Sequence, residues 1–326
     1  MAVLTSRRAL VLAMAWMVVT SVPSFLYWTS NCAAWRWPAS EPPGTACGSG
    51  ADPGGRALYL TIDHEYGRMG NKMFEYASLL GIARGQGRHP FVGRYRNGVD
   101  LAAVFHLTHV EDHGNVDKWS KVTEKNYAHL DQVFQNLPRC DVKLHGYVQS
   151  WKYFDNITDE IRREFTLRSN FSSRADSVKK EISQTFSNNS DLVFVGVHVR
   201  TRDGKSHSKT LEAPKSFYTH AFGVMRALHV GRNVTFLVAG NNRTWCQENF
   251  DEPDVVVLDD DKPEVHFAIL ASCDHMIVSI GTFGWWAGWL TGGNVIFYKR
   301  FPAPETYEAK GFVYQDYYPP SWIPLD

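Results

Sequence analysis

The side chains best suited to chemistry lie in three glycine-containing segments, each directly after an apolar run. The first segment carries Gly67, Arg68, Gly70 and Asn71 just before a helix pattern. Such a turn presents backbone N–H groups and a helix N-terminus, which suit a phosphate group. Arg68 would add positive charge, and Asn71 is placed to cap the helix. An ordinary tight turn between a strand and a helix has the same spacing, so both interpretations stay open.

The second segment ends the apolar run 192–199, whose continuous hydrophobicity is typical of a strand covered on both faces. His198, Arg200, Arg202 and Asp203 stand at its carboxyl end. Open α/β sheets bind ligands at this end of their strands, and an arginine there can hold a diphosphate through paired hydrogen bonds. A surface ion pair between an arginine and Asp203 would explain the same residues without a ligand.

The third segment follows the apolar run 275–280 and opens another helix pattern. Thr282 is placed to cap that helix, and with Phe283 and Gly284 it would offer a hydroxyl and backbone N–H groups to a phosphate oxygen. Trp285 and Trp286, which come next, are expected to pack in the core.

Several kinds of site are missing from the sequence. It contains no GxxxxGK[ST] phosphate loop, no GxSxG nucleophile elbow and no HExxH zinc helix. The run Asp259 to Asp261 is expected to be a solvated loop, so no metal site is predicted. Lys and Arg together number 34, as do Asp and Glu, and this zero net charge argues against a nucleic-acid partner.

The second half of the chain alternates between strand and helix patterns, which predicts a doubly wound parallel sheet. Pro263 in the first turn of one helix pattern fits its helix start. The predicted strands cover residues 192–199, 234–240, 255–258, 275–280 and 294–300, and the predicted helices cover 216–229, 243–250, 263–273 and 282–290.

The first half is less regular. Residues 57–62 form a plausible strand, followed by a helix over about 71–85 and a short strand over 89–93. Met73, Tyr76, Ala77, Leu80 and Ala83 fall on one face of that helix and are expected to be core. Residues 99–144 show weak periodicity. We therefore predict a second α/β domain over residues 57–190, facing a C-terminal domain over 191–326, because clefts between domains are favoured ligand sites.

The N-terminus predicts a membrane anchor. Residues 9–28 carry no charge and match the roughly 20 residues of a spanning helix. Arg7 and Arg8 would keep the tail, residues 1–8, in the cytosol. A cleaved signal peptide is the alternative, and either one sends the remaining chain into the secretory pathway. Residues 29–56, rich in Pro, Gly, Ala and Ser, read as a stem.

Glycosylation motifs agree with a secretory location. N-x-[ST] motifs stand at Asn156, Asn170, Asn188, Asn233 and Asn242. The 5 cysteines leave at least one thiol unpaired within a monomer. Cys32 and Cys47 in the stem could link subunits into a homodimer, but the pairing is not set by sequence.

Taken together, the segments resemble a known family, the galactoside α-1,2-fucosyltransferases. YGRMGNKMFEYA is similar to the family pattern GRLGNQM-x-EYA, VGVHVRTRDG to VGVHVRRGDY, and SIGTFGWWAGWLTGG to TIGTFG-x-WAAYLTGGD. WCQENF and HFAILASCDHMI supply smaller matches in the same order. The resemblance implies a type II Golgi membrane enzyme of GT-B-like architecture, with two facing Rossmann-type domains and a luminal catalytic part. It would transfer L-fucose from GDP-fucose to a galactose-terminated glycan with inversion and without an essential metal or other cofactor.

The resemblance also assigns roles to individual residues. By analogy, Arg200 contacts the diphosphate, and His198 and Asp203 match the same motif. Arg202 joins the predicted donor site, together with Gly67, Arg68, Gly70, Asn71, Thr282, Phe283 and Gly284. The chain departs from the pattern at Thr201, where the family has a second arginine, and at Lys72, where it has glutamine.

An inverting transfer also needs a base for the acceptor hydroxyl. Glu75, Asp203, His64 and Glu65 are the candidates, and sequence does not choose among them. Arg200, Asp203 and Glu75 form the predicted catalytic set. Another linkage or acceptor, or an inactive relative that binds glycans or nucleotides, are the alternative functions.

Overall fold

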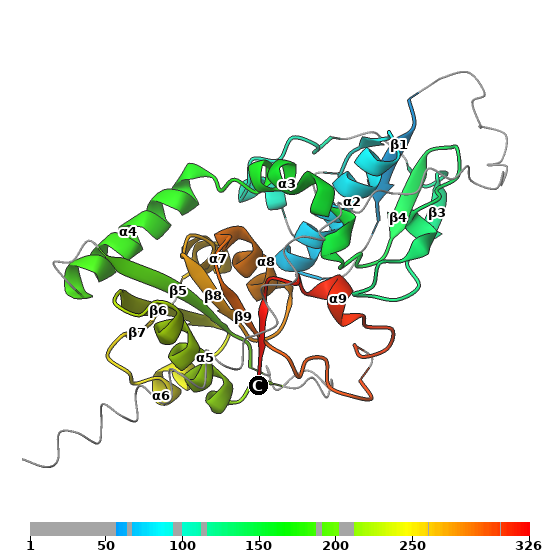
Figure 1. The fold of residues 1–326 in the computed structure, drawn as a ribbon. Helices are drawn as coiled ribbons and strands as arrows, with labels where there is room; N and C mark the ends of the chain where they lie inside the picture. Colours follow the sequence, from blue (N-terminus) through cyan, green and yellow to red (C-terminus); the bar gives the residue numbers. More distant parts are fainter. Residues whose placement is uncertain are drawn as a thin grey trace, which may run out of the picture. The chain divides into compact units, whose positions relative to one another are not determined.

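The computed structural model describes residues 57–63, 67–93, 100–111, 116–186, 191–201, 212–259, 261–306 and 308–326. The predicted tail, anchor and stem, residues 1–56, lie outside this part of the chain. None of the helices in the described part combines the length and the apolar character needed to cross a bilayer. Described residues before 190 and after 190 build separate parallel sheets (Figure 1).

The first sheet has the strand order β2-β1-β4-β3. Its strands are β1 (Tyr59–Ile62), β2 (His89–Pro90), β3 (Ser120–Thr123) and β4 (Val142–His145). Neighbouring strands are parallel throughout, and Leu60 of β1 lies opposite Val142 of β4. The α/β prediction for this half is confirmed. The segment predicted as irregular nevertheless supplies β3, and β4 ends just after it, because four-residue strands are too short to show a clear period.

The second sheet has the strand order β10-β9-β8-β5-β6-β7, again with parallel neighbours. Its strands are β5 (Leu192–Val199), β6 (Asn233–Gly240), β7 (Val255–Val257), β8 (His275–Val278), β9 (Val295–Tyr298) and β10 (Ile323–Leu325). The sequence prediction ended this sheet at residue 300, which is wrong. The C-terminal tail adds β10 with Pro324 in its middle, and an edge strand tolerates that proline.

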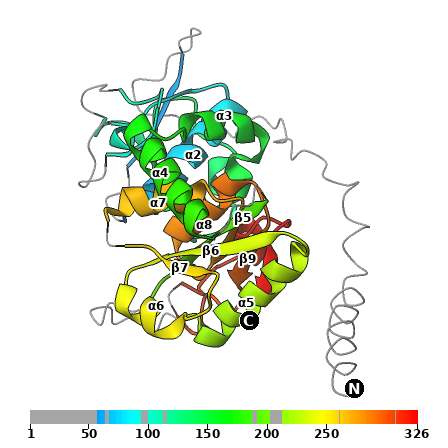
Figure 2. The ribbon, with the colours of Figure 1, turned by 90° about the vertical axis from the view of Figure 1, so that its left-hand side faces the viewer.

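Helices connect these strands. They are α2 (Met69–Gly85), α3 (Thr158–Glu164), α4 (Ser169–Phe186), α5 (Lys215–Leu228), α6 (Arg243–Asn249), α7 (Pro263–Ala271), α8 (Thr282–Thr291) and α9 (Tyr314–Tyr317). Short 3-10 helices are η1 (Leu101–Ala103), η2 (Gln132–Phe134), η3 (Trp151–Tyr153) and η4 (Asp155–Ile157). Helices α5 and α6 cover one face of the second sheet, and α7, α8 and α4 lie over the other (Figure 2).

Helix α2 joins the two halves because it packs against both the first sheet and α8 (Figure 1). The Phe74 ring lies 4.5 Å from Trp285 and 5.0 Å from Trp286 between ring centroids, and all three side chains are fully buried. The core role expected for these tryptophans is confirmed. Helix α2 is buried on more than the predicted face, Leu79 and Ile82 included, because it lies between two packed layers.

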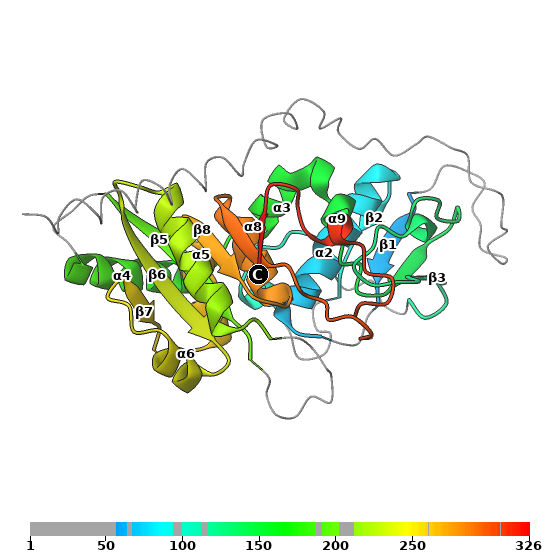
Figure 3. The same cartoon turned by 60° about the horizontal axis from the view of Figure 1, so that its bottom comes forward.

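The C-terminal segment returns to the first half before it ends in the second sheet (Figure 3). Trp151 Nε1 donates to the Gln315 carbonyl at 3.0 Å, and Ser150 Oγ donates to the Asp316 carbonyl at 2.7 Å. Lys152 Nζ forms an ion pair with the buried Asp316 at 2.7 Å. The chain then runs on to β10, so its tail ties the two halves together a second time.

Candidate functional site

A cavity of about 640 Å³ lies at the carboxyl ends of β5, β6 and β8. Residues 67–71 line it from the first half, and residues that follow the three strand ends line it from the second. Its volume falls within the roughly 300–1,000 Å³ typical of small-molecule sites, and strand carboxyl ends are where open α/β sheets bind ligands. The three glycine-containing segments therefore meet at one cavity.

Two helix N-termini approach each other at this cavity. A Cβ atom on Gly70 would stand 2.6 Å from the Thr282 carbonyl carbon and 2.7 Å from the Phe283 nitrogen, so only glycine fits between α2 and α8. The Thr282 hydroxyl donates to Asn71 Oδ1 at 2.6 Å across the same contact. Gly67 adopts φ +102°, a conformation that favours glycine. The first turns of α2 and α8 thus present their N–H dipoles to one space.

The predicted helix caps are wrong in detail. Helix α2 begins at Met69 after Arg68, so Asn71 lies inside the first turn instead of capping it. Gly281 precedes α8, and Thr282 is the first helical residue. Asn71 and Thr282 instead form the hydrogen bond between the two helices. A local sequence pattern cannot predict this bond, because the two residues are far apart in the chain.

His198 and Arg200 stand where β5 ends at the cavity. Burial and, to a lesser degree, the Arg200 charge lower the pKa of His198 to about 3, so its imidazole is neutral near pH 7. His198 Nδ1 is buried and has no hydrogen-bond partner in the described part of the chain. Its ring lies 5.2 Å from that of Phe283, and a Cβ on Gly284 would come within 2.5 Å of Nδ1. Gly284, which does not itself line the cavity, therefore leaves the space that the His198 ring occupies.

Two residues that sequence analysis missed hold the end of β5. The Arg200 backbone N–H donates to Ser279 Oγ at 3.1 Å. The Thr201 N–H donates to Asn241 Oδ1 at 2.8 Å, and Asn241 Nδ2 donates back to the Thr201 carbonyl at 2.9 Å. Both partners directly follow the strands next to β5, and that position in the sequence is the signal that could have identified them.

Of the remaining predicted residues, Arg68 is the one that the structure describes at the cavity. Arg68 lines the cavity and is exposed. Arg202, Asp203, His64 and Glu65 lie outside the described residues.

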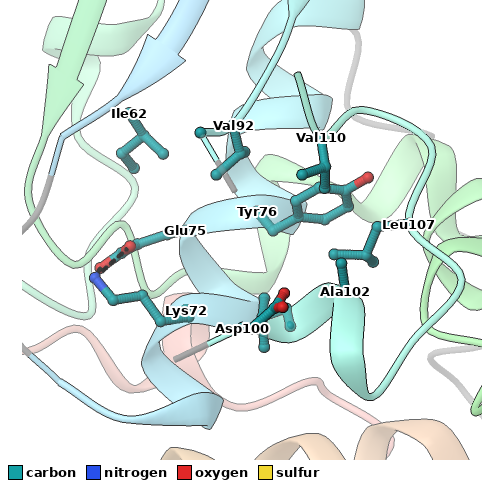
Figure 4. A pocket seen from close by; sticks show the side chains of 11 residues that line it. Ile62, Lys72, Glu75, Tyr76, Val92, Asp100, Ala102, Leu107 and Val110 are labelled. Atoms are coloured by element: carbon teal, nitrogen blue, oxygen red, sulfur yellow. Dashed lines mark hydrogen bonds and ion pairs between the residues drawn. The ribbon is translucent and has the colours of Figure 1, made fainter. Parts of the chain in front are cut away.

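Glu75 does not line the large cavity. Its carboxylate forms a buried ion pair with Lys72, 3.0 Å from Nζ to Oε2 (Figure 4). The pair lines a second cavity of about 40 Å³, beside Ile62 and Tyr76. The Glu75 side chain is only 5 % exposed. The structure therefore separates Glu75 from the space in which the helix N-termini and Arg200 meet.

Asp100 is the residue that lines both cavities, and sequence analysis did not select it. Glu264 and His266, in the first turn of α7, also line the large cavity. A signal for Glu264 existed, because an acidic residue and Pro263 open this helix after a strand. Asp100 lies in a segment with no clear period, so nothing in the sequence distinguished it.

Basic and acidic side chains both line the large cavity, and the acidic ones are Asp100, Asp261 and Glu264. A phosphate ligand would find its partners among the basic groups and the helix N-termini. Arg200 and Arg68 supply positive charge, and the N-termini of α2 and α8 supply N–H dipoles. The neutral His198 adds a ring nitrogen without a charge. Within the described residues, no group of three or more His, Cys, Asp or Glu side chains is arranged to hold a metal ion.

The asparagines of the glycosylation motifs are exposed where they are described, at Asn156, Asn170, Asn233 and Asn242. Asn242 also caps α6, its side chain accepting from the Trp245 N–H at 3.0 Å. The fifth, Asn188, is outside the described residues. Cys140 is disulfide-bonded, whereas Cys246 and Cys273 are buried free thiols.

Comparison with known sequences identifies the relatives of this chain. The model of the family described as glycosyl transferase family 11 matches residues 51–326. Galactoside α-(1,2)-fucosyltransferase 1 of Bos taurus is 32% identical over 283 residues, covering 82% of this chain and 76% of the relative. The Homo sapiens protein of the same name is 31% identical over 302 residues, covering 87% and 81%.

The solved structures to which this chain is similar include the fucosyltransferase NodZ from Bradyrhizobium, with a TM-score of 0.45 and 16% identity over 71% of this chain and 93% of that one. An Arabidopsis thaliana FUT1 variant in complex with GDP gives a TM-score of 0.48 and 12% identity, over 76% of this chain and 72% of that one.

Proposed function

The chain belongs to glycosyl transferase family 11, and we propose that it moves L-fucose from GDP-fucose to a hydroxyl of a terminal galactoside, forming an α-1,2 linkage. One observation carries the proposal: α2, α8 and the end of β5 meet at a single cavity, with Gly70 against Thr282 and Arg200 beside them. A GT-B-like architecture, with the donor held mainly by the second sheet, is part of the proposal.

The leaving group requires stabilisation of negative charge. When the bond between fucose C1 and the β-phosphate oxygen breaks, the electron pair passes to GDP. Arg200 and the N–H groups at the start of α8 and α2 would meet that charge in fixed positions. Because these donors are already arranged, they need not reorganise during the reaction. Ser279 and Asn241 contribute before the reaction, because they accept hydrogen bonds from the backbone N–H groups of Arg200 and Thr201 and so fix the position of Arg200.

The sugar carbon becomes oxocarbenium-like as GDP leaves, and the acceptor hydroxyl attacks from the opposite face. Attack from that face inverts the configuration at C1. The galactose-terminated acceptor would approach from the side of the first sheet. We propose that the reaction needs no metal, because arginine and helix dipoles supply the charge that a divalent cation would otherwise supply.

The cellular setting is proposed from sequence features. Residues 9–28 would anchor the chain in the Golgi membrane as a single-pass type II protein, with the catalytic part in the lumen. The exposed asparagines of the glycosylation motifs are compatible with a secretory route. A homodimer linked through the stem is a further part of this proposal.

The proposed function is tested by donor choice. The full-length protein in detergent is incubated with terminal galactosides and GDP-fucose, GDP-mannose or UDP-galactose, each with and without EDTA. We expect a fucoside product and GDP release with GDP-fucose only, unchanged by EDTA. Transfer from another donor alone would disprove the donor assignment. GDP binding without transfer to any acceptor would indicate an inactive relative, and loss of activity in EDTA would contradict the metal-free mechanism.

A further inference from the structure

One carboxylate at the large cavity, that of Asp100, has no evident role in holding the fold together. Asp100 lines both that cavity and the smaller one beside it. Its Oδ1 is shielded from solvent and has no hydrogen-bond partner in the described part of the chain. Asp100 precedes η1, but its side chain does not cap that helix. Shielded carboxylate oxygens are nearly always hydrogen-bonded in folded proteins, so an unpaired one indicates a role toward a ligand.

The other nearby carboxylates are occupied or differently placed. Glu75 is committed to the buried pair with Lys72, and Figure 4 shows the Asp100 carboxylate lying apart from that pair. Asp261 accepts from the Lys262 N–H at 2.7 Å. Glu264 begins α7, on the side of the second sheet. Asp100 alone among these belongs to the first half and also lines the large cavity.

The size of the smaller cavity limits the side from which a substrate can approach Asp100. Its volume of about 40 Å³ leaves room for water but not for a sugar ring. Of these two cavities, the large one is therefore the one through which an acceptor would reach Asp100. Arg200 and α8 enter that cavity from the second half, whereas Asp100, like the N-terminus of α2, belongs to the first half. Catalysis by inversion requires the base and the leaving group to lie on opposite faces of the sugar.

We propose that Asp100 is the general base that takes the proton from the acceptor hydroxyl. This inference rests on the proposed function. As the Asp100 carboxylate accepts the proton, the acceptor oxygen forms its bond to fucose C1. The bond from C1 to the β-phosphate oxygen breaks, and its electron pair leaves with GDP. The products are a fucoside, GDP and a protonated Asp100, which then returns its proton to solvent.

The test compares Asp100→Asn, Asp100→Glu and Glu264→Gln with the wild type in the full-length protein. Asp176→Asn, on the exposed surface of α4, is the matched control. The measurements are kcat and KM for donor and acceptor, and the Kd for GDP. For Asp100→Asn we expect kcat to fall about 10²- to 10⁴-fold, with the GDP Kd within about twofold of wild type. Asp100→Glu, which keeps a carboxylate, should recover part of the lost kcat.

Four results would overturn the inference. Asp100→Asn could keep its turnover, or lose GDP affinity instead of kcat, which would make Asp100 a donor-binding residue. Glu264→Gln could show the large loss of kcat in its place. If Asp100→Asn unfolds at a lower temperature than the wild type, Asp100→Glu decides alone, because a folded Glu variant that recovers none of the lost kcat contradicts a base at this position. A wild type that makes no fucoside refutes the proposed function itself, whereas an active wild type with an equally active Asp100→Asn refutes only the base.

Discussion

At the scale of single residues, Arg200 and His198 have different roles at the end of β5. Arg200 brings positive charge to the cavity, and His198 stays neutral because burial and that charge lower its pKa to about 3. Two protonated groups side by side would repel each other and would have to be desolvated together. A neutral ring beside one guanidinium avoids this cost.

Replacing Arg200 by alanine should abolish most of the transfer while the protein stays folded. A preorganised donor to a developing charge contributes about 10²–10³ in kcat, and the loss here should be at least that large. The measurement is kcat with GDP-fucose, alongside the melting temperature. Arg232→Ala is the control, because Arg232 pairs with Asp191 on the exposed surface. Normal turnover in Arg200→Ala would remove Arg200 from the site.

Gly70→Ala should weaken both the fold and GDP binding. A Cβ at this position collides with the backbone of Thr282 and Phe283, so α2 and α8 must move apart. We expect a loss of about 1–3 kcal/mol in the free energy of unfolding, measured by denaturant titration. Gly223→Ala in α5 is the matched control, because its Cβ would enter open space. That variant should gain up to about 1 kcal/mol. Equal stability of the two variants would show that the helix contact is not tight.

At the scale of elements, the carboxyl end of α8 depends on α3. Arg162 donates to the carbonyls of Leu290 and Trp289 at 3.0 and 2.8 Å, and its guanidinium lies 4.6 Å from the Trp289 ring centroid. A cation at a helix C-terminus satisfies the open carbonyls and the helix dipole together. The same helix therefore points its N-terminus at the cavity and has its other end held by the first half of the chain.

Arg162→Ala should lower the free energy of unfolding by about 1–3 kcal/mol, because it removes two hydrogen bonds and a cation–π contact. Arg163→Ala, one position along on the exposed side of α3, should change it by less than about 0.5 kcal/mol. Thermal and denaturant unfolding of both variants would test this. Similar losses in the two would mean that Arg162 does not hold α8.

A half-buried acid, Glu124, directly follows β3 and is held by the loop after β4. Glu124 Oε2 accepts from the Tyr147 and Val148 N–H groups at 2.8 and 3.1 Å, and Val148 adopts φ +43°. Burial raises the pKa of Glu124 to about 8, although these two hydrogen bonds oppose the shift. The acid therefore keeps its proton in the folded protein at a pH where it loses it in the unfolded chain.

This shift predicts a pH dependence of stability. Between the ordinary value of 4.5 and about 8, the folded state holds the proton and the unfolded state does not. The stability contributed by the protonated form is therefore complete at low pH and is lost as pH rises through that window. Glu124→Gln should remove this dependence on pH. The free energy of unfolding of the variant minus that of the wild type should therefore increase by at least about 1 kcal/mol between pH 5 and pH 8. A constant difference across this range would contradict the raised pKa.

At the scale of the whole molecule, the sequence predicted more of the second half than of the first. Long apolar runs such as 192–199, separated by helix patterns, indicate a parallel sheet. Strands of two to four residues do not, and β10 carries a proline. The Gly70 contact with Thr282 joins residues more than 200 positions apart, and no local pattern encodes such a pair. Asp100 was missed for the same reason, since its significance comes only from the two cavities that it lines.

The shared core explains why these distant residues keep their positions. Phe74, Trp285 and Trp286 are fully buried where α2 meets α8, and the C-terminal tail passes over the first half before joining the second sheet. The cavity is thus built by both halves, and its chemistry depends on their packing as much as on Arg200.

The most direct test of the account is the chemical structure of the product. The full-length protein is incubated with GDP-fucose and a terminal β-galactoside, and the purified product is analysed by NMR spectroscopy. We predict a single fucose in α configuration on the galactose 2-hydroxyl. A fucose on another hydroxyl would contradict the proposed linkage, and a β-fucoside would contradict inversion. The absence of any fucoside, from protein that binds GDP, would contradict the central claim that this cavity transfers fucose.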